Sequence, residues 1–242
     1  MHQAYNKILN AVTDHKIIDT QNPNSVAELN KCLNLTLPDA TLEVSTLPGC
    51  QEIELALINR NFDTGPLAPE VMQAVIRNPA YWAFCWGSGL GLAQYLAKNR
   101  HWVENKTVID LGSGCGIAAI AAVRAGARKV IAVDIDEQAL AATHTNASLN
   151  KVDVETYSEL AGLGADIILM ADVLYDKSNH PLLVAAQKIS SRVLVADSRI
   201  HDLKEFGFET IAELEALTYP NLGEFDEFRR VSIFVNKLDI VV

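Results

Sequence analysis

Short apolar runs alternate with stretches of helical spacing through the last two thirds of the chain. The runs are rich in aliphatic and β-branched residues, which is typical of strands buried on both faces of a sheet. They are Thr107–Leu111, Lys129–Val133, Asp166–Met170 and Val193–Ala196. Between them, segments such as Asp136–Leu149 and Leu182–Ile189 carry apolar residues at the spacing of one helix face. This alternation predicts an α/β domain whose strands are mostly parallel.

Three further runs complete the predicted sheet. Val152–Thr156 is expected to form a short strand that leaves Tyr157 at its end. Phe208–Ile211 and Arg230–Val235 are separated by too little chain for a crossover helix, so they are expected to pair antiparallel at the sheet edge. The result is a Rossmann-like, doubly wound sheet, whose ligands bind at the carboxyl ends of the strands.

The first 78 residues have a different pattern and are predicted to form an N-terminal α+β cap, with the main domain spanning residues 79–242. Ala4, Ile8 and Val12 have helical spacing, and Ser25–Glu28 matches a capping box that begins a second helix. Apolar residues at every second position on both sides of Pro48-Gly49 predict a β-hairpin, and residues 70–77 are expected to form another helix.

Composition narrows the possible partners. The 242 residues carry a formal net charge of −10 without any Lys/Arg run, so a nucleic-acid partner is disfavoured. The four cysteines and six histidines lack ligand spacing, which argues against a metal site. The first residues, Met1–Lys7, lack the apolar core of a signal peptide, and no apolar run approaches membrane-spanning length, so we expect a cytoplasmic protein without a membrane partner.

The strand Thr107–Leu111 leads directly into the glycine-rich stretch Gly112-Ser113-Gly114-Cys115-Gly116. Its spacing is G-x-G-x-G, whereas a dinucleotide fingerprint is G-x-G-x-x-G. The next strand is followed by Asp134, at the position where nucleotide-binding folds hold a ribose diol. Flanked by Asp110 and Asp134, this pattern resembles the S-adenosylmethionine corner of class I methyltransferases. The predicted cofactor-binding residues here are Asp110, Gly112, Ser113, Gly114, Gly116 and Asp134.

An acceptor site is predicted at the end of the fourth parallel strand. Methyl transfer from a sulfonium requires proximity and alignment, and an amine acceptor must first lose its proton. A carboxylate can orient such an amine, and Asp172 is the candidate, with Tyr175 as a wall of the acceptor channel. A helix cap is the alternative role for Asp172.

Four aromatic residues lie between Tyr81 and Trp86. Either they form a hydrophobic plug under the cap, which we expect for Phe84, or they face a ligand, since aromatic faces suit sulfonium and ammonium groups. Tyr81 and Trp82 are assigned to the acceptor channel. The preceding N-P-A-Y resembles an amide-methylating motif, but it follows a helix rather than a strand. Ser88, in a second G-x-G-x-G, is expected to cap the next helix.

Two motifs extend the resemblance. Ala171-Asp172-Val173-Leu174-Tyr175 is similar to the D-x-x-Y signature of seven-β-strand protein-lysine methyltransferases. The segment Pro79–Trp86, followed by Leu-Ala-x-Tyr-Leu, resembles the electron-transfer-flavoprotein β-subunit lysine methyltransferases and their bacterial relatives. The resemblance implies a seven-stranded sheet with an antiparallel last strand. It also implies cofactor contacts by Trp86, the glycine loop, Asp134 and Ala171, and acceptor roles for Asp172 and Tyr175. Tyr157 is the candidate for the ring beside adenine.

The leading hypothesis is therefore an S-adenosylmethionine-dependent methyltransferase that acts on lysine side chains of a protein. The resemblance implies two candidate protein substrates, electron-transfer flavoprotein β-subunit and a ribosomal protein. The same fold acting on a small or heteroaromatic amine, such as a nicotinamide-like compound, is the first alternative. A cofactor-binding regulatory protein without catalysis is the second.

Overall fold

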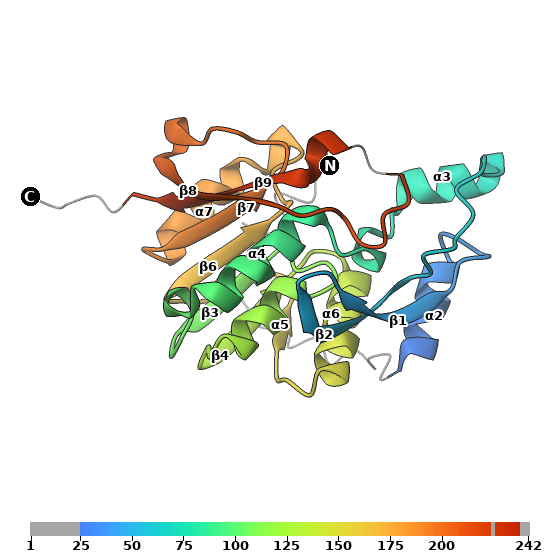
Figure 1. Cartoon of the computed structure of the whole chain (residues 1–242), viewed down its shortest axis with the longest axis horizontal. Helices are drawn as coiled ribbons and strands as arrows, with labels where there is room; N and C mark the ends of the chain where they lie inside the picture. Colours follow the sequence, from blue (N-terminus) through green and yellow to red (C-terminus); the bar gives the residue numbers. More distant parts are fainter. Residues whose placement is uncertain (1–24, 224–225, 238–242) are drawn as a thin grey trace, which may run out of the picture.

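The computed structural model describes residues 25–223 and 226–237, and its centre is a seven-stranded sheet (Figure 1). The strand order is β5-β4-β3-β6-β7-β9-β8, and all pairs are parallel except those that β9 makes with β7 and β8. The strands are β3 (Thr107–Leu111), β4 (Lys129–Val133), β5 (Glu155–Tyr157), β6 (Ile167–Ala171), β7 (Val193–Asp197), β8 (Phe208–Glu215) and β9 (Arg230–Asn236). The predicted mostly parallel sheet with an antiparallel last strand is confirmed.

Helices cover both faces of this sheet, as a doubly wound fold requires. They are α4 (Gly87–Lys98), α5 (Ile117–Arg124), α6 (Glu137–Leu149) and α7 (Pro181–Ile189). Neighbouring residues of β3 point to opposite faces, so Val108 joins the core with α4 and α5, while Ile109 joins the core with α7. Both side chains are fully buried, which explains why the strands read as continuous apolar runs.

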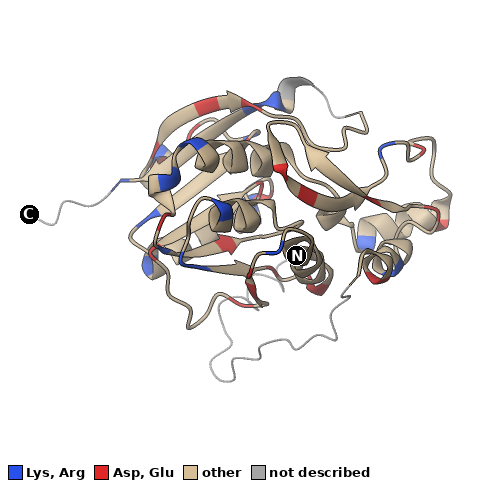
Figure 2. Cartoon of the chain, turned by 60° about the horizontal axis from the view of Figure 1, so that its bottom comes forward, with Lys and Arg blue, Asp and Glu red and all other residues tan. Residues whose placement is uncertain are grey.

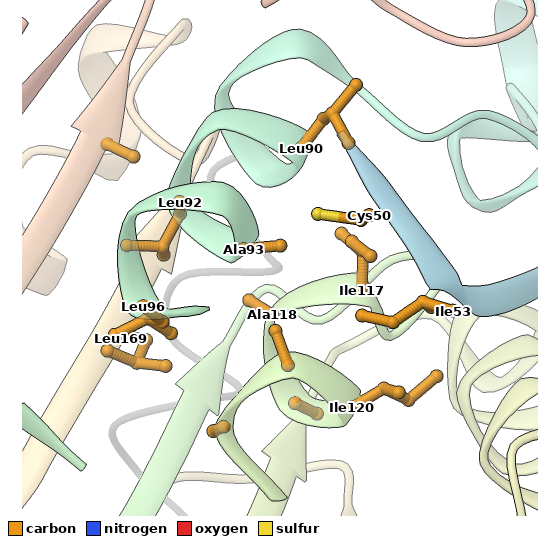
Figure 3. Close-up of a cluster of buried hydrophobic side chains, with 14 of the residues drawn as sticks. Cys50, Ile53, Leu90, Leu92, Ala93, Leu96, Ile117, Ala118, Ile120 and Leu169 are labelled. Atoms are coloured by element: carbon orange, nitrogen blue, oxygen red, sulfur yellow. The ribbon is translucent and has the colours of Figure 1, made fainter. Parts of the chain in front are cut away.

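The core under α4 and α5 also receives the hairpin that precedes them in the sequence. Figure 3 shows Cys50 and Ile53 of the hairpin beside Leu90 and Ala93 of α4 and Ile117 of α5. Gly89 of α4 lies so close to α5 that a Cβ atom there would come within 2.9 Å of the Ile117 side chain. The second G-x-G-x-G is thus explained by close packing of α4.

Two N-terminal elements, α2 (Val26–Asn34) and β2 (Cys50–Ile58), pack onto α6. β1 (Leu42–Leu47) pairs antiparallel with β2, and α3 (Pro69–Arg77) follows the hairpin in the chain. The Asn146 side chain of α6 accepts from the Ala56 N–H of β2 at 2.8 Å, and Asn150 accepts from the Glu54 N–H at 3.1 Å. Leu29 and Leu33 of α2 are fully buried in the same contact region. The predicted hairpin and both helices are confirmed, whereas the helix expected from Ala4 lies outside the described residues. The division at residue 78 stays a prediction.

Two local expectations were wrong. The expected strand Val152–Thr156 is displaced, because β5 spans only Glu155–Tyr157 and Val152 lies in the irregular segment before it. Ser88 does not cap α4: the helix begins at Gly87, its N-cap residue is Trp86, and Ser88 lies inside the first turn.

Five short 3-10 turns complete the described elements. They are η1 (Tyr81–Ala83), η2 (Arg100–Trp102), η3 (Lys177–Asn179), η4 (Lys204–Phe206) and η5 (Asp226–Arg229). Lysine and arginine residues are interspersed with acidic ones on the face seen in Figure 2. Within residues 25–223 and 226–237, no helix combines the length and apolar character needed to cross a membrane.

Candidate active site

The glycine loop after β3 makes a tight, solvent-accessible corner. Gly116 has φ of +81°, and a Cβ atom there would lie 3.0 Å from the Cα atom of Thr143 on α6. Only glycine allows both this conformation and this approach. Gly114 has φ of +52°, and the space beside its Cα is open. The loop is therefore closed against α6 on one side and free to receive a ligand at Gly114.

Asp134 faces this open side of the loop from the end of β4. Its Oδ2 atom accepts from the Gly114 N–H at 3.0 Å, and its Oδ1 atom accepts from the Asp136 N–H at 3.0 Å. The side chain is partly exposed, yet loss of water contact raises the pKa of Asp134 to about 6, against the effect of its N–H donors. A partly exposed carboxylate beside an open glycine loop fits a ligand that offers hydroxyl donors, such as the ribose of S-adenosylmethionine.

Two predicted cofactor residues, Asp110 and Ser113, are buried at the corner. Asp110 is 1% exposed, and its carboxylate accepts from the Ala119 N–H in the first turn of α5 at 2.9 Å. Burial raises the pKa of Asp110 to about 7. Ser113 is also buried, and its hydroxyl accepts from that of Thr143 at 3.1 Å. Direct contact of the Asp110 carboxylate with a cofactor is contradicted by this burial. Asp110 instead holds α5 against the loop, and cofactor contacts by Ser113 and Gly116 stay predictions.

Tyr157 and Ala171 lie at the ends of the strands on either side of β3 and β4. Tyr157 ends β5, and its carbonyl accepts from the Asp134 N–H at 3.2 Å. Ala171 ends β6 and is partly exposed. Both positions adjoin the corner, and their cofactor contacts stay predictions.

Asp172 follows β6 in a conformation that is rare for a residue with a side chain. Its φ is +53°, which costs free energy and is often found at functional sites. The N–H of Ser88 donates to Oδ2 at 3.0 Å, and the Ser88 hydroxyl donates to Oδ1 at 2.6 Å. An Arg199 guanidinium nitrogen lies 3.8 Å from Oδ1. Desolvation, and then the charge of Asp197, raise the pKa of Asp172 to about 6, against the effects of Ser88 and Arg199.

Asp172 does cap a helix, although not the segment that follows it. Ser88 lies in the first turn of α4, where backbone N–H groups have no partner within the helix. The Asp172 carboxylate therefore caps the N-terminus of α4, a helix that begins more than eighty residues earlier in the chain. Both Asp172 oxygens retain lone pairs for another donor, so the cap does not exclude a role toward an amine.

Aromatic residues flank Asp172 and its partner Ser88 in the chain, since Tyr175 follows Asp172 by three positions and Trp86 precedes Ser88 by two. Tyr175 is 54% exposed and contacts Tyr81, which is 48% exposed, with the ring centroids 5.9 Å apart. Trp86 lies 5.8 Å from the Tyr81 ring, and its indole N–H donates to the Tyr81 carbonyl at 2.8 Å. Phe84 packs against Trp86 at 5.5 Å. We call Tyr81, Trp86 and Tyr175 the aromatic mouth.

Trp82 is absent from this mouth. Its side chain is fully buried against α6, where the indole N–H donates to Gln138 at 3.2 Å. The 3-10 turn η1 directs Tyr81 outward and Trp82 inward. The assignment of Trp82 to the acceptor channel is therefore wrong, and this ring is the hydrophobic plug that the sequence also allowed.

The corner and the acceptor region are in direct contact. A Cβ atom at Gly112, which has φ of +79°, would lie 2.6 Å from the side chain of Val173, the residue after Asp172. The two sets of residues thus meet across the ends of β3 and β6, which are neighbours in the sheet. A ligand held at the corner would have the Asp172 segment as its wall.

Sequence reasoning missed three polar residues of this site. Ser88 and Arg199 contact Asp172, and Asn146 donates to the Cys115 carbonyl of the glycine loop at 2.8 Å. The position of Ser88 in a helix's first turn was a usable signal, whereas nothing in the local sequence marks Asn146. A cavity of about 420 Å³ lies elsewhere, beside Lys129 at the amino end of β4, and contains none of these groups. Within the described ranges, no cluster of metal-ligating side chains occurs.

The fold and the corner together define a class I S-adenosylmethionine-dependent methyltransferase. A family model described as ribosomal protein L11 methyltransferase (PrmA) matches residues 94–185. A 16S rRNA methyltransferase of T. thermophilus (RsmC), solved with AdoMet and guanosine, superposes with a TM-score of 0.54 at 13% identity. That match covers 83% of this chain and 51% of the other and concerns the fold alone. S-adenosylmethionine is the expected cofactor.

Sequence relatives identify the particular family. The electron transfer flavoprotein beta subunit lysine methyltransferase of Xenopus laevis is 30% identical over 192 residues, 74% of this chain and 76% of that protein. Its human counterpart is 38% identical over 102 residues, 40% of this chain and only 39% of the human protein. The chain belongs to the family of electron-transfer-flavoprotein β-subunit lysine methyltransferases.

Proposed function

We propose that the protein is an S-adenosylmethionine-dependent N-methyltransferase that methylates lysine side chains of a protein. One observation carries the proposal: the backbone of Asp172 is held in a left-handed conformation beside the cofactor corner, three residues before the exposed ring of Tyr175. Strain of this kind persists only where surrounding contacts enforce it, and it is concentrated at functional sites.

Each group has a separate task in this proposal. The Gly112–Gly114 loop and Asp134 bind the cofactor, with Asp134 accepting hydrogen bonds from the ribose hydroxyls. S-adenosylmethionine supplies, when bound, the electrophilic methyl group. The aromatic mouth packs along the aliphatic stem of lysine and excludes water from the amine. Asp172 accepts a hydrogen bond from the amine and orients its lone pair.

The acceptor amine must be neutral before it can react. A free lysine has a pKa near 10.4, so at neutral pH it arrives as an ammonium ion. Desolvation at the mouth and the nearby sulfonium charge both lower that pKa. The negative charge of Asp172 has the opposite effect, because it raises the pKa of the amine. The same carboxylate fixes the direction of the amine, and alignment is the larger need for an in-line displacement.

A protein acceptor is favoured over a small amine by the exposure of the mouth. Tyr81 and Tyr175 are each about half exposed, whereas a small-molecule site normally encloses most of its ligand. Relatives are named for electron-transfer flavoprotein β-subunit and for ribosomal protein L11, which are the first acceptors to test. The cytoplasmic location stays a prediction, which cell fractionation can test.

Transfer of label from tritiated S-adenosylmethionine tests the proposal. Purified enzyme is incubated separately with cell lysate, with purified electron-transfer flavoprotein β-subunit and with a panel of small amines. Label on lysine in a protein supports the proposal. Label only in the small-molecule fraction supports the alternative acceptor, and cofactor binding without any transfer supports a regulatory protein.

A further inference from the structure

Asp172 receives two hydrogen bonds from one residue of a distant helix. Ser88 is fully buried, and both its N–H and its hydroxyl donate to the Asp172 carboxylate, at 3.0 and 2.6 Å. One residue thus contacts both oxygens and fixes the rotation of the carboxylate. Donation to a carboxylate also stabilises its ionised form.

A second carboxylate lies beside Asp172 in the sheet. Ala171 and Ala196 are register partners, so Asp172 and Asp197 each follow a paired residue at the same end of β6 and β7. Asp197 is 1% exposed. Its Oδ1 atom accepts from the N–H groups of Arg199 and Ile200 at 2.8 and 2.9 Å. Its Oδ2 atom is buried without a hydrogen-bond partner among the described residues.

An unpartnered buried carboxylate oxygen is costly to retain in a fold. Asn at position 197 would keep the Oδ1 contacts with both N–H groups, so the turn after β7 does not by itself require a charge there. The negative charge of Asp197 acts on Asp172, the carboxylate at the same end of the neighbouring strand. A like charge near a carboxylate disfavours its ionised form, so the charge of Asp197 makes Asp172 a stronger proton acceptor.

We infer that Ser88 and Asp197 are positioning residues that act on the acceptor amine through Asp172 in opposite directions. Ser88 holds the Asp172 carboxylate ionised and oriented, and Asp197 adds a second negative charge that strengthens it as a hydrogen-bond acceptor. The inference rests on the proposed function, since it assumes that Asp172 meets the amine.

Other groups face this pair and complete its electrostatics. Arg199 lies 3.8 Å from Oδ1 of Asp172, with its guanidinium 4.6 Å from the centre of the Phe228 ring. His201 lies on the Asp197 side, and the buried thiol of Cys85 lies on the Asp172 side. Arg199 offsets one of the two negative charges, so a lysine ammonium would still be attracted to the pair.

Carbon-13 NMR of aspartate-labelled full-length protein tests the inference without any acceptor. The Asp172 resonance, assigned by its loss in Asp172→Asn, is titrated in wild type, Ser88→Ala and Asp197→Asn. We expect its midpoint to rise in Ser88→Ala and to fall in Asp197→Asn, each by about one pH unit. Ser88→Thr, which keeps the hydroxyl, should restore the wild-type midpoint. A structural role alone would not move the midpoint in opposite directions.

Midpoints that stay unchanged, or that move in the same direction, would overturn the inference. If Asp197→Asn does not fold, as judged by thermal melting, Asp197→Ser removes the same negative charge and replaces it in the titration. The acidic limb of the pH–rate profile, measured with electron-transfer flavoprotein β-subunit, should follow the NMR midpoints. Turnover retained by Asp172→Asn would refute the proposed role of Asp172. Turnover lost in Asp172→Asn, with unmoved midpoints in the other variants, would overturn this inference alone.

Discussion

The cofactor corner and the aromatic mouth are neighbours in space, but they are built in different ways. The corner comes from one continuous stretch, Thr107 to Asp134, in which a strand, a glycine turn, a helix and a second strand follow in order. The mouth and its carboxylate come from residues 81–88, 171–175 and 197–199, which only the folded sheet and α4 bring together. A site made from one stretch is visible in a sequence, whereas a site made from three must be assembled.

This difference has a functional reading. In the proposed function, the corner binds a cofactor that is the same across a large class of enzymes, and its residues act mainly through backbone geometry. The mouth would instead suit one acceptor, through aromatic side chains that are at least partly exposed. We therefore expect changes at the corner to affect cofactor affinity and changes at the mouth to affect turnover and acceptor use.

The largest effect is expected for Asp172→Asn. The amide keeps the shape but loses the charge, and methylation should fall at least about a hundredfold, the scale of losing an acid–base group. Single-turnover transfer from tritiated cofactor, at saturating cofactor, measures this loss. Rates within about threefold of wild type would reduce Asp172 to a structural cap of α4.

A smaller effect, on binding rather than turnover, is expected for Asp134→Ala. Losing a charge-assisted hydrogen bond to the ribose corresponds to roughly 1.5–3 kcal/mol, or about tenfold or more in cofactor affinity. Calorimetric titration with S-adenosylmethionine measures it, with thermal melting as the check on folding. An unchanged dissociation constant would remove Asp134 from the cofactor site.

Tyr175→Ala and Tyr157→Ala form a matched pair across the two regions. Loss of the Tyr175 ring should raise KM for the acceptor protein about three- to tenfold, the scale of one aromatic contact. Loss of the Tyr157 ring should weaken cofactor binding on a similar scale and leave the acceptor KM unchanged. Steady-state kinetics with each substrate varied in turn would show whether the two effects separate. If either variant changed both the acceptor KM and the cofactor KM, the two regions would not act independently.

The smallest effect on activity, but a clear one on stability, is expected for Asp110→Asn. Burial raises the pKa of Asp110 to about 7, above its usual value, so the folded state holds a proton that the unfolded state releases. Wild-type stability should therefore fall as pH rises from about 4 to 7, by up to about 1.4 kcal/mol per pH unit, and then level off.

The asparagine variant cannot ionise at this position, and it retains an acceptor for the Ala119 N–H. Its free energy of unfolding should lack this pH-dependent loss. Urea melts of both proteins between pH 4 and 8 measure the difference. Parallel curves would mean that Asp110 titrates normally, and its buried position under the corner would then need another explanation.

Most of the fold was predictable because each element carries its own signal. Apolar runs marked the strands, and Ser25 and Asp136 marked helix starts where their side chains accept N–H groups. Val152 misled because an apolar residue before a short edge strand looks like part of it. The antiparallel pairing of the last two strands was predictable, whereas their order, with β9 rather than β8 beside β7, was not.

The site was predictable where a strand end carried the residue, as at Asp134 and Asp172. It was not predictable where the direction of a side chain decided the role. Tyr81 and Trp82 are adjacent in a 3-10 turn, and no pattern in six residues tells which ring faces solvent. The sequence likewise does not distinguish the environments of the two aspartates at the corner. In the fold, Asp110 is buried under the loop, whereas Asp134 faces its open side.

In the proposed function, the corner binds the cofactor and the mouth with Asp172 activates the acceptor. The decisive measurement is the dissociation constant of S-adenosylmethionine for Asp172→Asn, obtained by calorimetry. A carboxylate that serves the acceptor predicts a value within about threefold of wild type, although this variant should have lost methylation. Cofactor affinity that falls in parallel with turnover would show that Asp172 acts through the corner and would contradict the division.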